Sequence, residues 1–219
     1  MSVLVRNLPD QLVELVRNRI LSGEMLDAVA VRQDALAAEL GVSKIPLREA
    51  LARLEEEGLL ESRTNRGYFV RPMTAAELEE VYALRLKLEP DAMAAAAARA
   101  TDADRAVADH ALAVLERLTD AHAAGVGAAN RAFHAALFEP GAQPVTSGIL
   151  NRLHILSERY VRTHLQPLGR DDRANHEHRE MLDAWLARDA ARVAELTRRH
   201  TQKTLEDLRE QLASSPSSR

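Results

Sequence analysis

The segment from Leu36 to Leu51 contains two short helical patterns on either side of a single glycine, Gly41. Glycine suits the position just after a helix, where the backbone turns into the left-handed region. Ser43 follows as a candidate N-cap for the second helix, and Pro46 fits the first turn of that helix. Two helices joined by such a tight bend predict a helix-turn-helix, a motif whose second helix enters the major groove of DNA.

The flanking segments extend this motif to a winged helix-turn-helix. Apolar residues at helical spacing predict a further helix over residues 8–21. Residues 59–63 and 68–71 have the composition of short strands, and residues 64–67 supply turn chemistry between them. We therefore predict a DNA-binding domain over residues 1–72, with a small β-hairpin as its wing.

The rest of the sequence shows helical periodicity and no strand pattern. It predicts an all-α helical bundle over residues 73–213, followed by a Ser-rich tail at 214–219 that we expect to be disordered. The predicted bundle has about six helices, at residues 75–99, 103–124, 128–138, 145–165, 172–187 and 190–213. The chain is therefore expected to be mainly α, with two domains.

Composition excludes several classes of protein. The chain has no cysteine, which excludes disulfides and thiolate metal sites. It has no secretory signal pattern and no apolar run of about 18 residues, so we expect a soluble, cytoplasmic protein with no membrane partner. The net charge of −4 argues against a general nucleic-acid binder, so DNA binding must depend on where individual cations lie.

Candidate DNA contacts lie at the start of the second helix of the motif and at the hairpin turn. Residues 1–72 hold 10 Lys and Arg against 11 Asp and Glu, so this domain is not basic as a whole. Arg48 can bind guanine through two hydrogen bonds, whereas Lys44 can bind guanine or phosphate. The residues predicted to contact DNA are Ser43, Lys44, Ile45, Arg48, Arg66 and Gly67.

Three stretches of this domain resemble a known family. Residues 41–51, 54–59 and 66–70 are similar to the DNA-binding domain of the GntR transcriptional regulators. The resemblance covers about residues 10–71 and implies a winged helix that binds operator DNA.

The sequence departs from the residues that are usual in that family at several positions, among them Asp27 and Ala28, where Pro-Gly is usual. Lys44 stands where Arg is usual, Ile45 where Thr is usual, and Asp34 where a basic residue is frequent. Asp34 can repel phosphate, or it can accept a hydrogen bond from cytosine. These departures concern which DNA sequence is bound.

Four polar residues of the predicted bundle are candidate metal ligands. Asn130 and His134 are one helical turn apart and share a helix face, while His178 and His200 lie on the last two predicted helices. Three imidazoles and one oxygen from facing helices can hold a divalent transition metal. The alternative is that each is an ordinary core or surface residue. The remaining histidines, interpreted as ordinary, are His110, His122, His154, His164 and His176.

A second resemblance covers about residues 78–209, where the sequence is similar to the FCD ligand-binding domain of the FadR-like branch of the GntR family. The motifs that carry it lie at residues 85–90, 130–134, 177–179 and 199–200. It implies that a metal, most often Zn or Ni, is held by Asn130, His134, His178 and His200 beside a small organic-acid effector. It also makes Arg85 the residue expected to grip the effector carboxylate.

Together these features predict a homodimeric regulator, expected to be a repressor, that binds a palindromic operator and responds to a small carboxylate metabolite. One alternative is a constitutive regulator with a purely structural metal. Another is an enzyme that uses the histidine-bound metal. The sequence opposes the enzyme, because no carboxylate is placed beside the histidines as a clear general base and no nucleophile motif accompanies them.

Overall fold

The computed structural model describes residues 8–121, 123, 125–140, 143–164 and 171–214. The chain divides into two compact units, Met1–Thr74 and Ala75–Arg219. Each unit has its own packed interior.

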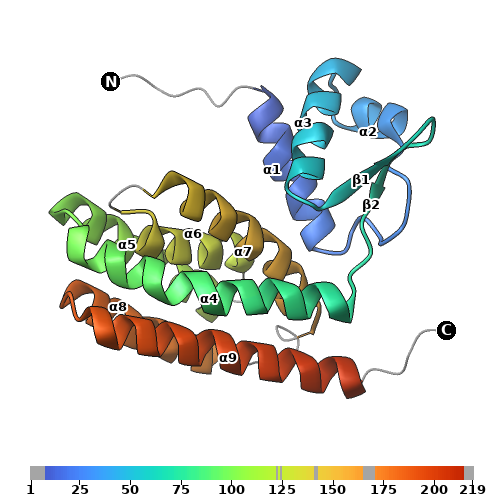
Figure 1. Cartoon of the computed structure of the whole chain (residues 1–219). Helices are drawn as coiled ribbons and strands as arrows, with labels where there is room; N and C mark the ends of the chain where they lie inside the picture. Colours follow the sequence, from blue (N-terminus) through green and yellow to red (C-terminus); the bar gives the residue numbers. More distant parts are fainter. Residues whose placement is uncertain (1–7, 122, 124, 141–142, 165–170, 215–219) are drawn as a thin grey trace. The chain divides into compact units, whose positions relative to one another are not determined.

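The N-terminal unit is a winged helix-turn-helix (Figure 1). Its elements are α1 (Leu8–Leu21), α2 (Gln33–Glu39), α3 (Lys44–Glu56), β1 (Leu60–Arg63) and β2 (Gly67–Val70). The two strands pair antiparallel, with a register that runs from Leu60 opposite Val70 to Arg63 opposite Gly67. The fold class predicted for this part of the sequence is confirmed, with strand boundaries shifted by one residue.

The bend between α2 and α3 is a Schellman turn. Gly41 has φ +65°, and its N–H donates to the carbonyl of Ala38 at 3.3 Å. The N–H of Val42 donates to the carbonyl of Ala37 at 3.0 Å, which closes the turn. Ser43 is the N-cap residue of α3, but its hydroxyl makes no capping hydrogen bond, so that part of the prediction is wrong.

The inner face of α3 is buried and determines which residues of this helix face outward. The buried residues of α3 are Leu47, Ala50, Leu51 and Leu54. Their neighbours across the interior include Val13, Val16 and Ile20 of α1, the helix against which α3 packs. Burying a side chain of this size stabilises the fold by about 1.5–3 kcal/mol. The orientation of α3 therefore leaves Lys44, Ile45 and Arg48 exposed.

The C-terminal unit is an all-α bundle (Figure 1). Its helices are α4 (Ala75–Arg99), α5 (Asp102–Asp120), α6 (Val126–Phe138), α7 (Pro144–His164), α8 (Asp171–Leu186) and α9 (Ala190–Ser214). The predicted helix α5 was four residues too long, because the N–H of Ala123 turns back to the carbonyl of Leu118. Ser214 belongs to α9 rather than to the tail, and residues 215–219 lie outside the described residues.

Helix α4 packs against four other helices of this bundle. It packs along α9 and also against α6, α7 and α8. Its side chains Tyr82 and Met93 are fully buried, as are Leu182 and Trp185 of α8. The indole Nε1 of Trp185 donates to the carbonyl of Leu137 at 2.9 Å, so this polar atom is satisfied in the core. No helix in the described part of the chain is long and apolar enough to cross a membrane.

Two glycine substitutions are expected to change stability in opposite directions. Gly41→Ala should lower the free energy of unfolding by about 1–2 kcal/mol, because alanine is strained at positive φ. Gly148 lies within α7, where an added Cβ would meet nothing within 4 Å. Gly148→Ala should therefore raise the free energy of unfolding by about 0.5–1 kcal/mol. Chemical denaturation measures both, and equal effects would contradict this account of Gly41.

Candidate functional site

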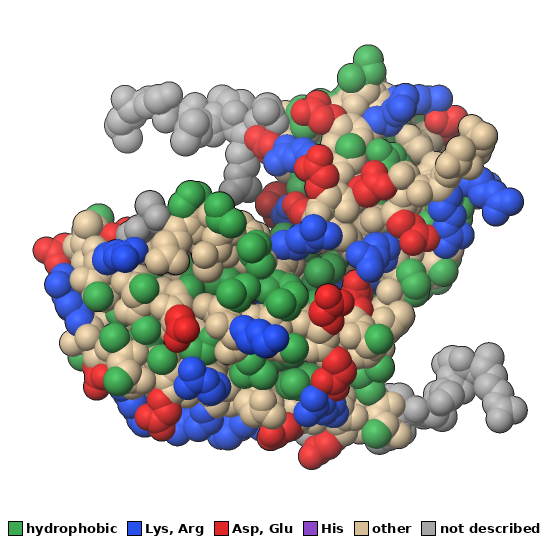
Figure 2. Space-filling view, in the orientation of Figure 1, with side chains coloured by type: hydrophobic (Ala, Val, Ile, Leu, Met, Phe, Trp, Pro, Cys, Tyr) green, Lys and Arg blue, Asp and Glu red, His purple; other side chains and the backbone are tan. Residues whose placement is uncertain are grey.

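The first candidate site is a hollow on the N-terminal unit, between the helix-turn-helix and the hairpin. Four of the residues predicted to contact DNA line it: Lys44, Arg48, Arg66 and Gly67. Ser43 and Ile45 are exposed in the adjacent first turn of α3. The structure thus brings the predicted set onto one side of this unit. Figure 2 shows cations and acids interspersed over the face drawn, so the surface there is not a uniform positive field.

The acid at Asp34 pairs with a cation of this hollow. Its carboxylate lies 2.7 Å from the ammonium of Lys44, with the two side chains 79% and 63% exposed. A pair this exposed contributes only about 0–1 kcal/mol to stability. Its electrostatic effect matters more, because the carboxylate offsets the charge that Lys44 would present to a phosphate. Arg48, one turn later, is an exposed cation of the same helix.

Gly67 has a structural role next to the turn of the wing, where it pairs with Arg63. Its φ is +80°, and an added Cβ would lie 3.2 Å from Nε2 of Gln33. The sequence predicted Gly67 as a DNA contact. The structure adds a reason within the unit, since both the backbone conformation and the Gln33 contact favour glycine.

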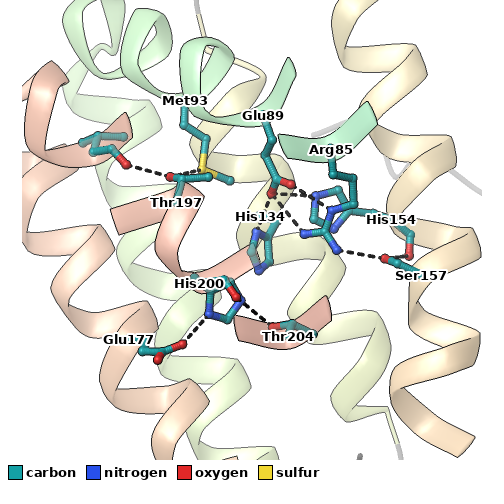
Figure 3. A network of polar contacts seen from close by, with 11 residues as sticks. Arg85, Glu89, Met93, His134, His154, Ser157, Glu177, Thr197, His200 and Thr204 are labelled. Carbon is teal, nitrogen blue, oxygen red and sulfur yellow. Dashed lines mark hydrogen bonds and ion pairs between the residues drawn. The ribbon is translucent and has the colours of Figure 1, made fainter. Parts of the chain in front are cut away.

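The second candidate site is a cluster of three buried histidines in the C-terminal unit, two of which, His134 and His200, are labelled in Figure 3. His134 comes from α6, His178 from α8 and His200 from α9. One nitrogen from each ring lies within 4.8 Å of the others. Asn130, one turn before His134, lines the same cavity. The structure therefore brings together all four residues that the resemblance implied as metal ligands.

Two carboxylates orient the rings of this cluster. Nδ1 of His134 lies 3.0 Å from Glu89, and Nδ1 of His200 lies 2.7 Å from Glu177. When Nδ1–H donates to a carboxylate, the lone pair of Nε2 remains for another partner. The sequence indicated no carboxylate beside the histidines as a clear general base, and the structure adds two carboxylates that contact imidazole nitrogens of the cluster. Glu89 is 45 residues from His134 in the chain, so its proximity depends on how α4 packs.

His178 has the most unusual environment of the three. Its side chain is buried, and neither ring nitrogen has a hydrogen-bond partner in the part of the chain that the structure describes. Burial, followed by the neighbouring His200 and His134, lowers the pKa of His178 well below its ordinary value. Burial also lowers the pKa of His134 to about 3. Neutral imidazoles are the form that binds metals, and a buried polar ring without a partner is costly unless something occupies it.

A buried ion pair lies next to the cluster (Figure 3). Glu89 is 0% exposed and accepts from Nε of Arg85 at 2.9 Å. Nε2 of His154 lies 2.9 Å from the same carboxylate, and Nη1 of Arg85 donates to Ser157 at 3.1 Å. Burial alone would raise the pKa of Glu89, but the charge of Arg85 and the two histidine contacts hold it well below its usual range.

This network changes the interpretation of two residues. His154, which sequence reasoning set aside as ordinary, is buried and connects α7 to Glu89. Arg85 lines the cavity as expected of an effector contact, but its guanidinium is already bonded to Glu89 and Ser157. Among the other histidines, His110 and His176 are exposed, as expected. His122 and the side chain of His164 lie outside the described residues.

The cavity beside the histidines has a volume of about 100 Å³. About 10–15 Å³ on this scale holds one water, so the cavity can hold an ion and a small molecule. Arg162 of α7 lines it, and burial lowers the pKa of this guanidinium. Its nearest acid in the cavity wall is Glu158, at 3.8 Å, which also pairs with Arg131. Arg162 is not among the residues predicted from the sequence to bind a ligand.

Comparison with known proteins agrees with this architecture. Residues 8–70 match the family described as "Bacterial regulatory proteins, gntR family", and residues 80–203 match the FCD domain. The sequence is 30% identical over 196 residues to the HTH-type transcriptional repressor GlaR of Escherichia coli, covering 84% of this chain and 88% of that protein. It is 28% identical over 214 residues to the uncharacterized HTH-type transcriptional regulator BphR of Paraburkholderia xenovorans, covering 94% and 87%.

Solved structures share the fold. The E. coli protein McbR/YncC superposes with a TM-score of 0.77 over 97% of this chain and 100% of its own, at 21% identity. A GntR regulator from Rhodococcus superposes with a TM-score of 0.73 over 95% and 99%, at 22% identity. At these identities the likeness concerns the fold alone.

The Arg85–Glu89 pair is expected to be essential to the stability of the C-terminal unit. Glu89→Ala should lower the free energy of unfolding by about 3–5 kcal/mol, because it leaves the buried charge of Arg85 without a counter-ion. The double substitution Arg85→Met with Glu89→Leu removes both charges and should cost less than Glu89→Ala alone. Urea denaturation in EDTA measures both, with no contribution from bound metal. A loss below about 1 kcal/mol in Glu89→Ala would contradict this role.

Proposed function

The chain belongs to the GntR family of bacterial regulatory proteins and carries an FCD domain, and we propose that a metal and a small organic acid bound in its C-terminal unit control its affinity for operator DNA. It is a DNA-binding transcriptional regulator and not an enzyme. The observation that carries the proposal is the convergence of three buried imidazoles, one of which has no hydrogen-bond partner among the described residues.

The proposed DNA reader is the start of α3 together with the wing. Its residues are Ser43, Lys44, Ile45, Arg48, Arg66 and Gly67. Helix-turn-helix regulators commonly act as dimers, with two recognition helices in successive major grooves of a palindromic site. We therefore assign this chain a homodimer and a palindromic operator, and we propose the cytoplasm as its location because a transcriptional regulator acts on DNA.

The residues of the C-terminal cluster fit a divalent transition metal. His134, His178 and His200 would supply nitrogen ligands and Asn130 an amide oxygen, a donor set that suits Zn or Ni. Metal–nitrogen bonds of about 2.1 Å place two ligand atoms of one ion at most about 4.2 Å apart. The three imidazole nitrogens lie within 4.8 Å of one another, so small side-chain shifts would bring them to bonding distance of one ion. FCD domains bind metals in some members of the family, which supports the same assignment. When bound, the ion supplies a fixed positive charge that attracts a carboxylate.

Arg162 is the better candidate for a direct effector contact in this chain. The guanidinium of Arg85 is committed to Glu89 and Ser157, so a ligand would have to displace one of them. Arg162 lines the same cavity and is only partly exposed. Its nearest acid in the cavity wall, Glu158, is 3.8 Å away, whereas Glu89 is 2.9 Å from Arg85. We keep Arg85 as the group that shapes the cavity wall and assign Arg162 to the effector carboxylate.

Control of transcription requires that the effector favour one arrangement of the protein over another. A ligand with equal affinity for the DNA-binding and non-binding states would shift neither. The relative in E. coli is named a repressor, and we propose repression that the effector releases. If metal binds but no small molecule changes DNA affinity, the constitutive alternative with a structural metal is correct.

Metal binding is tested by two neighbouring histidines of α8. Wild-type protein, loaded with Zn or Ni and then dialysed, should retain about one ion per chain by mass spectrometry of the metal. His178→Ala should lose affinity by about 100-fold or more, whereas His176→Ala should match wild type, because the side chain of His176 is 77% exposed. Wild-type protein that retains no ion would refute the metal site, and full retention by His178→Ala would remove that residue from the ligands.

Effector binding is tested on α7. In the presence of Zn, a panel of small mono- and dicarboxylates should contain at least one acid that raises the melting temperature of wild-type protein. Arg162→Gln should abolish that increase, because a neutral amide cannot form a charged two-point contact with a carboxylate. Arg152→Gln, at an exposed position of the same helix, is the control and should respond like wild type. An equal response in Arg162→Gln would count against the assignment.

A further inference from the structure

Ile45 is a large hydrophobic residue whose side chain is exposed to solvent at the start of α3. Its side chain is 79% exposed, the highest value among the large hydrophobic residues in the described part of the chain. It is the second residue of α3, directly after Lys44. An exposed hydrophobic residue alone needs no explanation, and Val145 on α7 is nearly as exposed. What distinguishes Ile45 is its position in the first turn of the recognition helix, where side chains reach base edges.

The packing of α3 directs Ile45 away from the protein. Residues two apart on a helix lie on nearly opposite sides, and Leu47 is fully buried. The outward strip that contains Ile45 continues one turn later with Glu49, which is also exposed. A strip with an isoleucine and a carboxylate is unsuited to phosphate. It suits the floor of the major groove, where thymine presents a methyl group and cytosine an amino donor.

The charges beside Ile45 support a contact with bases. Lys44 lies 2.7 Å from Asp34, so the first turn of α3 presents a neutralised cation next to an isoleucine. Arg48, three residues after Ile45, lines the hollow that faces the wing and can supply the hydrogen bonds to a base or phosphate. The first turn therefore offers an apolar contact where hydrogen-bond donors would otherwise be expected.

From this arrangement we infer that Ile45 recognises the 5-methyl group of a thymine in each half-site of the operator. The inference rests on the proposed binding of α3 in the major groove. It specifies the chemistry of one base contact, since thymine is the only base that presents a methyl group there. Truncation of Ile45 should not disturb the fold, because its side chain contributes little to the protein interior.

The test removes the methyl group from the DNA. Full-length protein first selects binding duplexes from a randomised pool, and the selected duplex is then remade with deoxyuridine in place of one thymidine at a time. At one position of each half-site, this change should weaken wild-type binding about fourfold, the expected effect of one buried methyl group. Ile45→Ala should bind the thymidine duplex no more tightly than wild-type protein binds the deoxyuridine duplex. The variant should also bind the thymidine and deoxyuridine duplexes with equal affinity.

Leu26→Ala is the matched control, because Leu26 is 65% exposed in the same unit but lies outside α3. It should retain the wild-type preference for thymidine. If selection enriches a sequence but no deoxyuridine change weakens wild-type binding, the inference is wrong and α3 reads DNA in another way. An equal methyl effect in Ile45→Ala also overturns it. If no sequence is enriched, the failure lies with the proposed function itself.

Discussion

The C-terminal unit depends on one fully buried carboxylate. Glu89 lies on α4, and its hydrogen bonds reach His134 on α6 and His154 on α7 as well as Arg85 on its own helix. Moving such a charge out of water is costly, and it is tolerated only when the partners around it are all in place. The network therefore favours one packing of these three helices over alternatives that would leave the charge unpaired.

The same carboxylate links the core to the histidine cluster. Because Glu89 holds Nδ1 of His134, and Glu177 holds Nδ1 of His200, both rings are oriented by groups outside the cluster. His178 has no such support from the described residues, and both nitrogens of its buried ring lack a hydrogen-bond partner among them. A ligand at this cluster would contact residues from α6, α8 and α9 at once, so its binding and the stability of the bundle are expected to be coupled.

In the N-terminal unit, the recognition surface follows from what α3 must bury. Four apolar residues of α3 face the interior, and the bend at Gly41 sets where the helix begins. The residues left outside are not a uniform positive surface, because Asp34 is paired with Lys44 and Ile45 is apolar. The chemistry of the surface is therefore specific to a few positions, as expected for a reader of base edges rather than a general binder of DNA.

The sequence by itself determined the elements of this protein, because apolar periodicity, glycine and capping residues are local signals. These signals located the helix-turn-helix around Gly41, the wing and the six helices of the bundle, with errors of a few residues at helix ends. The sequence also indicated His134, His178 and His200 as candidate metal ligands. Only the tertiary structure identified Glu89, Glu177 and His154, because a buried polar residue has no periodic signal and gains its role from partners far away in the chain. The pairing of Asp34 with Lys44 and the exposure of Ile45 were likewise decided by how α2 and α3 pack.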